Sequence, residues 1–106
     1  MNSKSYKVER TLRQLGDDLG TWRKLRGMTQ AQLADRAGIA RNTLRNLERG
    51  EGGVSIANLL QVLRALGIVD NVSQALDPYE SDVGRLRSEE RLPERVRPRK
   101  VELGDG

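Results

Sequence analysis

Residues 29–50 of this chain read TQAQLADRAGIARNTLRNLERG, and their pattern predicts two short helices joined by a tight turn. Thr29 suits the N-cap of the first helix, because its hydroxyl can accept from a free amide of the first turn, and Gln32 completes a capping box. Helical spacing gives this helix a narrow apolar face, made of Leu33, Ala34 and Ala37. Gly38 suits the left-handed conformation that ends a helix, so we expect the first helix to lie between Thr29 and Gly38.

The second predicted helix runs from about Ala40 to Arg49. Leu44 and Leu47 are its only strongly apolar side chains, and their spacing of three places them on one face. The other faces carry arginines and asparagines, which can make bidentate hydrogen bonds to base edges in the major groove of DNA; these are Arg41, Asn42, Arg45 and Asn46. Such a pair of helices is typical of the helix-turn-helix of DNA-binding proteins. The alternative is a solvated surface helix with incidental arginines.

The same stretch resembles a known family. The pattern T-Q-x-x-L-A-x-x-A-G-I-x-x-x-T-L-x-x-L-E-R-G is similar to the helix-turn-helix of the lambda-repressor/Cro type, the XRE family, and the resemblance extends from Leu12 to about Leu76. The positions that match in register are Gln30, Leu33, Ala34, Gly38, Ile39, Thr43, Leu44, Leu47, Glu48 and Gly50. One departure is Ala40, where family members often carry Ser or Thr as the cap.

The outward position of the polar side chains and the resemblance together predict a DNA-binding site. Bases are expected to be read by Arg41, Asn42, Arg45 and Asn46. The DNA backbone is expected to be contacted by Thr29, Gln30, Thr43, Arg23, Lys24 and Arg49. We interpret Glu48 as a structural residue that pairs with a neighbouring arginine.

Composition agrees with a small intracellular binding protein. The chain has 106 residues, no Cys and no Phe, and a formal charge of +4. The absence of Cys predicts a reducing, cytoplasmic environment, and no apolar run is long enough for a membrane span or a signal peptide. Residues 1–50 carry 11 Lys and Arg against 5 acids, whereas residues 51–82 carry 1 against 5. The basic first half suits an anionic partner, although ordinary surface patchiness is the alternative.

The pattern along the chain predicts an all-α fold of five helices in a lambda-repressor-like domain over residues 9–77. Residues 1–8 are expected to be flexible, and the first helix spans about Glu9 to Arg26. Its apolar stripe is Leu12, Leu15, Leu19 and Trp22, with Trp22 in the core. After the helix-turn-helix, Ser55 is expected to cap a largely buried helix that ends near Leu66 and is followed by a short helix at 72–76. A further set of apolar residues fits either a small monomeric core or a dimer seam, and the resemblance implies the seam because domains of this family commonly dimerise: Leu60, Ile68, Val69, Val72 and Leu76.

Residues 78–106 have a different composition, rich in Arg, Glu, Pro and Gly, which predicts a mostly disordered tail. The ending DPYESDVGRLRSEERLPERVRPRK is similar to that of small HipB-like repressors encoded beside HipA-like kinases. That resemblance implies the alternative function, an antitoxin that binds and neutralises a HipA-like toxin.

An enzymatic function is not expected. The chain has neither His nor Cys, which removes the usual zinc ligands, the thiol nucleophile and the imidazole base. The adjacent acids Asp17–Asp18 and Glu89–Glu90 point apart on a helix, and no phosphate-binding Gly-rich loop is present. We therefore predict no catalytic residues, metal or cofactor. The expected function is that of a cytoplasmic, nucleoid-associated repressor, binding an inverted-repeat operator in double-stranded DNA as a homodimer.

Overall fold

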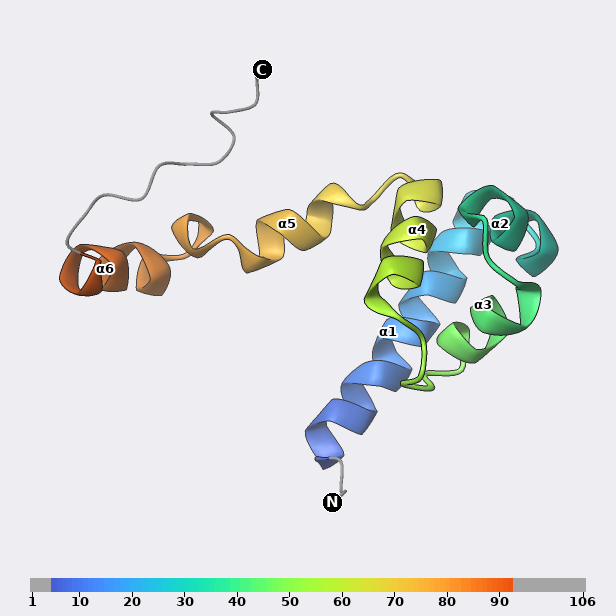
Figure 1. The fold of residues 1–106 in the computed structure, drawn as a ribbon, viewed down its shortest axis with the longest axis horizontal. Coiled ribbons are helices and arrows are strands. Elements are labelled where there is room, and N and C mark those ends of the chain that lie inside the picture. The colour runs from blue at the N-terminus through green and yellow to red at the C-terminus, as the bar shows by residue number, and fades with distance from the viewer. Residues whose placement is uncertain (1–4, 93–106) are drawn as a thin grey trace. The chain divides into compact units, whose positions relative to one another are not determined.

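The computed structural model describes residues 5–92, which are helical throughout except for short connections (Figure 1). The chain divides into two compact units, Met1–Asp70 and Asn71–Gly106, where the sequence predicted one domain over residues 9–77. The described helices are α1 Tyr6–Leu25, α2 Gln30–Ala37, α3 Arg41–Glu48, α4 Ile56–Leu66, α5 Asp70–Leu76, the 3-10 helix η1 Pro78–Glu80 and α6 Asp82–Arg91. The all-α prediction is confirmed for this range, but the range holds six α-helices rather than five.

Helix α1 begins at Tyr6, three residues before the predicted start. Ser5 is its N-cap, and the Ser5 Oγ accepts a hydrogen bond from the Val8 amide at 3.0 Å. The prediction of a flexible segment over residues 1–8 is therefore wrong for residues 6–8, because a serine cap was overlooked; residues 1–4 lie outside the described range. Trp22, predicted as core, is half-buried, and the Arg26 guanidinium lies over its ring, 5.8 Å from the centroid.

Helices α2 and α3 form the predicted helix-turn-helix. Thr29 and Gln32 make the capping box, with the Gln32 amide donating to Thr29 Oγ1 at 3.1 Å and the Thr29 amide donating to Gln32 Oε1 at 2.9 Å. Gly38 ends α2 with φ 73° and ψ 31°, a left-handed conformation in which a side chain would be strained. Helix α3 is one residue shorter at each end than predicted, and Ala40 is its N-cap.

The core of the first unit lies where α2 packs against α3 and α4, and α1 against α3. Its buried apolar side chains are Leu19, Met28, Leu33, Ala34, Ala37, Leu44, Leu47, Val62, Leu63 and Leu66. Helix α4 starts after Ser55, whose Oγ accepts from the Asn58 amide, and ends before Gly67, as predicted. Its apolar face is only partly covered, because Ile56 and Leu60 remain exposed.

The second unit contains η1 and α6, in a segment that was predicted to be mostly disordered. Asp77 accepts from the Tyr79 amide at 2.9 Å, and Ser81 accepts from the Gly84 amide at 2.9 Å, so side-chain caps start both helices. The disorder prediction is therefore wrong for residues 78–91, because it weighed apolar content and overlooked local capping. The remainder of the predicted tail, residues 93–106, lies outside the described range.

The residues that suggested a dimer seam differ in exposure. Leu60 and Leu76 are exposed, Leu76 at 76%, whereas Ile68, Val69 and Val72 are half-buried.

Between residues 5 and 92, no helix combines the length and apolar character needed to cross a membrane. Within the same range, no group of three or more potential metal ligands comes together.

Candidate nucleic-acid interface

Helix α3 has one buried face and one outward face. Leu44 is fully buried and Leu47 is 5% exposed, so these two side chains attach α3 to the core. At 3.6 residues per turn, Asn42, Arg45 and Asn46 lie on the opposite side of the helix. Asn42 is exposed, and Arg45 and Asn46 are half-buried. The outward side of α3 therefore carries two amide groups and a guanidinium.

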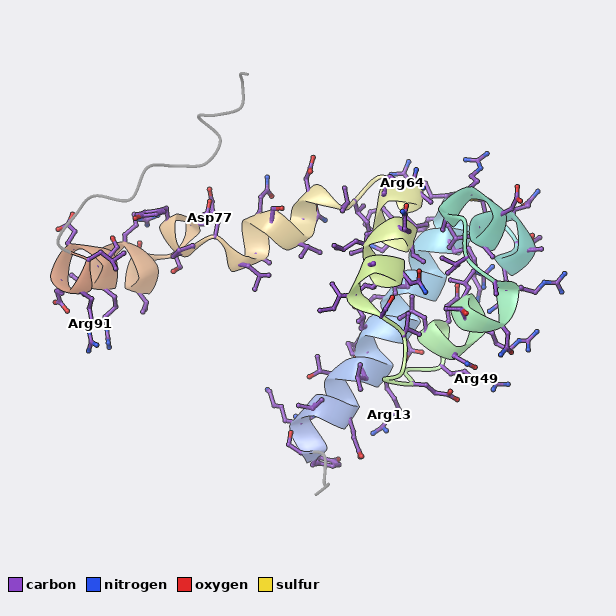
Figure 2. All side chains as sticks on the ribbon, viewed as in Figure 1. Arg13, Arg49, Arg64, Asp77 and Arg91 are labelled. Carbon is purple, nitrogen blue, oxygen red and sulfur yellow. The ribbon has the colours of Figure 1, made fainter. Side chains whose placement is uncertain are left out.

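The remaining predicted contacts of α3 lie at its edges. Arg41 is exposed at the first residue of the helix, and Thr43 is half-buried. Arg49, labelled beside the C-terminal end of α3 in Figure 2, is exposed and follows the last helical residue. Ala40 supplies no side-chain cap, as its identity predicts, so the first turn of α3 begins without the hydrogen bond that a serine or threonine would provide.

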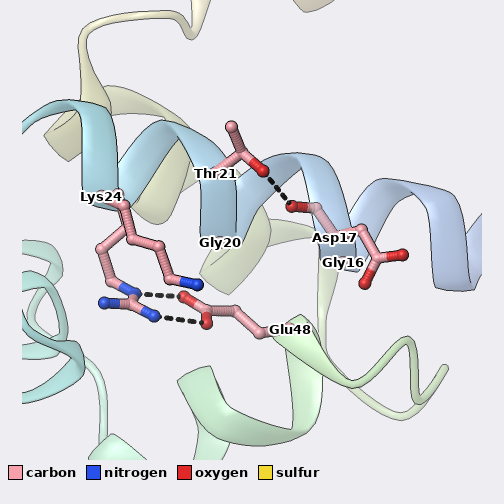
Figure 3. A pocket seen from close by; sticks show the side chains of 7 residues that line it. Gly16, Asp17, Gly20, Thr21, Lys24 and Glu48 are labelled. Atoms are coloured by element: carbon pink, nitrogen blue, oxygen red, sulfur yellow. Dashed lines mark hydrogen bonds and ion pairs between the residues drawn. The ribbon is translucent and has the colours of Figure 1, made fainter.

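An ion pair joins α1 to the end of α3. Arg23 Nε donates to Glu48 Oε2 at 2.8 Å, and Arg23 Nη2 donates to Glu48 Oε1 at 3.2 Å (Figure 3). The two side chains are only 12% and 10% exposed. The predicted pairing of Glu48 with an arginine is therefore confirmed, and its partner comes from 25 residues earlier in the chain.

Two of the predicted phosphate contacts converge on this carboxylate. Gln30 Nε2 donates to Glu48 Oε1 at 3.0 Å, and Arg23 Nη1 donates to the Met28 carbonyl at 2.9 Å. All three nitrogens of the Arg23 guanidinium thus have acceptors inside the protein. The network links α1, α2 and α3, so it holds the C-terminal end of α3 against the other two helices. Removing one partner from a largely buried pair such as this one is destabilising, because the other charge is left without compensation.

A close backbone approach lies beside this network. A Cβ atom added to Gly16 would stand 2.5 Å from the Glu48 carbonyl oxygen and 2.7 Å from that of Leu47. Only glycine therefore allows α1 to approach the C-terminal end of α3 so closely. The sequence prediction missed this contact, although the spacing of Gly16 and Gly20 along one side of α1 is a signal for close helix packing.

Figure 3 shows the open groove that this arrangement leaves between α1 and the end of α3. Its volume is about 280 Å³, and its lining is Gly16, Asp17, Gly20, Thr21, Arg23, Lys24 and Glu48. Thr21 Oγ1 donates to the Asp17 carbonyl at 3.0 Å, and the Glu48 carboxylate is engaged as described. Lys24 is exposed at this edge, so it is the predicted α1 contact that remains on the surface.

The sequence also did not predict a long-range hydrogen bond from Arg64 of α4 to α2. Arg64 Nη2 of α4 donates to the Arg36 carbonyl at the end of α2 at 3.1 Å, and Arg64 Nε donates to Gln61 Oε1 at 3.0 Å. The last carbonyls of a helix are unpaired within it, so a cation there is favourable. This contact helps to hold α2 against α4, behind the outward face of α3.

The family model described as Helix-turn-helix matches residues 10–70, which is more than half of the chain and includes most of α1 and all of α2 to α4. Neither the curated proteins nor the solved structures include a significant match to the chain.

Proposed function

This chain belongs to the helix-turn-helix family of DNA-binding regulators, of the XRE type, and we propose that it is a sequence-specific repressor that binds operator DNA through α3. The observation that carries the proposal is the outward face of α3. Asn42, Arg45 and Asn46 project from the side opposite the buried Leu44 and Leu47. Arginine and asparagine are the side chains that discriminate guanine and adenine through paired hydrogen bonds in the major groove.

The proposal gives the neighbouring polar residues two kinds of role. Arg41 joins the three outward residues in reading bases, and phosphates are contacted by Thr29, Thr43, Lys24 and Arg49. Arg23 and Gln30 hold Glu48 and so position α3. The proposal keeps the phosphate contact expected of Gln30 but not that of Arg23, because all three guanidinium nitrogens of Arg23 have acceptors inside the protein. Phosphate contacts set the register of the protein on the duplex, whereas base contacts carry the specificity.

We further propose that the repressor acts as a homodimer on an inverted repeat. In helix-turn-helix dimers the two recognition helices enter the major groove about one helical turn, roughly 34 Å, apart. Exposed apolar side chains are the candidates for the seam between the two copies, Leu60 and Leu76 among them. The expected place of action is the nucleoid in the cytoplasm, and the expected target includes the promoter of its own gene.

The deciding experiment is a binding titration with the DNA immediately upstream of the gene and with a scrambled duplex, at several salt concentrations. We expect binding to the native duplex to be tighter by at least about 10³, the range of specific recognition. Equal affinities for both duplexes, falling steeply with salt, would reduce the interaction to electrostatic attraction and contradict the proposal.

Two substitutions distinguish a base contact from a phosphate contact. Arg41→Ala should cost about 1–3 kcal/mol of binding free energy on the operator and relax selectivity at one base position. Lys24→Ala should weaken binding to all duplexes alike and lower the salt slope by about 1. If Arg41→Ala instead weakens all sequences equally, Arg41 contacts the backbone and leaves the set of base-reading residues.

The second candidate is the antitoxin function, and the surface of α6 favours it. Val83, Leu86 and Leu92 are exposed, and none of the residues of α6 is buried. In this proposal, the apolar side of α6 binds a HipA-like kinase encoded beside the gene. Leu86→Asp in the full chain should then abolish binding to that kinase and leave operator binding intact. Unchanged kinase binding, or no binding by the wild-type chain, would contradict it.

A further inference from the structure

The apolar stripe of α1 is longer than the core against which it packs. Leu19 is 2% exposed and Val8 is 51% exposed, with Leu15 and Leu12 half-buried between them. Figure 1 shows the first turns of α1 extending past α2, α3 and α4. An exposed continuation of a core stripe is typical of a surface that binds a partner.

An apolar groove follows this part of the stripe. Its volume is about 210 Å³, and its lining is Lys7, Val8, Thr11, Leu12 and Leu15. The loop after α3 lies on one side of it, since a Cβ atom added to Gly52 would stand 3.2 Å from Leu12 Cδ1. The other side is open, because Lys7 and Thr11 are exposed there. We call this surface the α1 groove.

The side chains of the α1 groove are arranged symmetrically about Leu12. Val8 comes four residues before it, and Leu15 comes three residues after it. An exposed base, Lys7, comes five residues before it, and an exposed acid, Asp18, comes six residues after it. Lys7 and Asp18 are separated by about three helical turns, so they lie on the same edge of α1.

This symmetry fits a second copy of the same helix. When two identical helices pair antiparallel about a two-fold axis, each edge meets the same edge of the other copy. With the axis beside Leu12, that leucine meets its own equivalent, and Val8 meets Leu15 of the second copy. Lys7 then meets Asp18 of the second copy. One register satisfies all three pairs to within one residue, a rise of about 1.5 Å.

We propose that the α1 groove binds the α1 groove of a second copy, so that the homodimer is held by an antiparallel pair of α1 helices. The inference rests on the homodimer of the proposed function and names its surface. A second copy is the occupant because one edge carries both signs of charge at matching distances from Leu12. Two copies in this register therefore attract each other through two ion pairs, Lys7 with Asp18 in each direction.

The same pairing would determine how far apart the two recognition helices lie. Gly16, one turn after Leu12, lies against the backbone at the end of α3. Each α3 is thus attached to the helix that forms the seam. In helix-turn-helix dimers, the spacing of the recognition helices must match about one turn of DNA. Weakening the α1 pair should therefore weaken binding to an inverted repeat and leave binding to a single half-site unchanged.

The first test is sedimentation velocity of the full-length chain over a range of concentrations. The wild type should show a monomer–dimer equilibrium. Val8→Asp should raise its dissociation constant about ten-fold or more, because each copy would bury an unpaired charge. Far-UV circular dichroism verifies that this variant is folded, as expected at an exposed position.

Charge reversal tests the register. Lys7→Asp alone, or Asp18→Lys alone, places like charges opposite each other twice and should raise the dissociation constant about five-fold. The double variant restores opposite charges in both pairs and should recover the affinity of the wild type. The matched control is Asp17→Lys, the same change at an exposed neighbour that lines the groove beside α3 instead. It should leave the dissociation constant unchanged.

Single cysteines test proximity, because the chain has none and a disulfide can then form only between copies. Thr11→Cys lies beside the proposed axis, so oxidised glutathione should convert two such thiols to an intermolecular disulfide. Thr21→Cys is the control, at an exposed position of the same helix more than two turns farther along. It should remain uncross-linked at the same protein concentration.

Three outcomes would overturn the proposal. A wild type that stays monomeric at every concentration leaves the groove to another partner, and selective binding to operator DNA would then still support the proposed regulator. A dimer that Val8→Asp and the single charge reversals do not weaken has its seam elsewhere. A double variant that dimerises no better than the single ones contradicts the pairing of Lys7 with Asp18.

Discussion

Helices α3 and α6 are both short and polar, but they are held in opposite ways. Helix α3 has no side-chain cap, and it depends on two buried leucines and on the ion pair of Glu48 with α1. Helix α6 has no buried residue, and it is started by Ser81 and supported by Arg85, which donates to Asp82 and to the Tyr79 carbonyl. One helix takes its position from tertiary packing, and the other takes its shape from local hydrogen bonds.

In the proposed functions, the two kinds of support suit two different tasks. A helix that reads bases must be held at a fixed angle, because side chains displaced from the base edges lose their paired hydrogen bonds. Tertiary anchoring gives α3 that fixed angle. A helix with local support alone keeps its apolar side chains available for a partner, as the exposed Val83 and Leu86 of α6 are.

The largest expected effect comes from breaking the anchor of α3. Glu48→Ala should lower the free energy of unfolding by about 3–5 kcal/mol, because it leaves the Arg23 guanidinium largely buried without its carboxylate. Urea unfolding followed by far-UV circular dichroism measures this. The control is Asp82→Ala, which breaks an exposed ion pair within α6 and should lower the free energy of unfolding by no more than about 0.5 kcal/mol. Equal losses of unfolding free energy in the two variants would contradict the idea that α3, unlike α6, depends on tertiary anchoring.

Leucine truncations should give the next largest difference. Leu44→Ala removes a fully buried side chain and should cost about 2–5 kcal/mol of unfolding free energy. Leu86→Ala, at a position that is 58% exposed, should change it by less than about 0.5 kcal/mol. The same unfolding curves report both values. A substantial loss in Leu86→Ala would mean that α6 is packed in the folded protein.

The smallest expected effects come from adding a side-chain N-cap to α3 and from removing the one that α6 has. Ala40 has an extended backbone, φ −68° and ψ 145°, which suits a serine N-cap. Ala40→Ser should therefore raise the free energy of unfolding by about 1 kcal/mol. Ser81→Ala should reduce the helical circular dichroism signal, because α6 loses the hydroxyl that accepts from Gly84. An unchanged spectrum for Ser81→Ala would show that this cap is dispensable for α6.

Much of the first unit could be predicted from the sequence because its helix ends have strong local signals. The capping box of Thr29 and Gln32, the left-handed Gly38 and the serine before α4 place three helix boundaries within about one residue. The pairing of Glu48 with an arginine was also predictable in kind. The sequence could not show that this arginine is Arg23, since the pairing depends on how α1 crosses the end of α3, where Gly16 lies against the α3 backbone.

The rest was missed for two physical reasons. The low apolar content after residue 77 predicts disorder, but Asp77 and Ser81 supply caps that start helices without a core. The roles of polar side chains depend on which partner each selects when several are within reach. For this reason the sequence did not predict that Gln30 donates to Glu48 or that Arg45 donates to Asn42. The assignment of individual residues to bases and phosphates stays a prediction until it is tested on DNA.

The half-buried Trp22 gives this protein a built-in optical probe. It is the only tryptophan of the chain and belongs to the first unit, in α1 beneath the Arg26 guanidinium. Its indole emission, excited selectively, therefore responds to the environment of the helix-turn-helix unit. Tyr79 is the only aromatic residue of the second unit. Selective excitation of Trp22 in the unmodified protein can thus follow the first unit without any attached dye, whereas tyrosine emission comes from both units, because Tyr6 lies in the first.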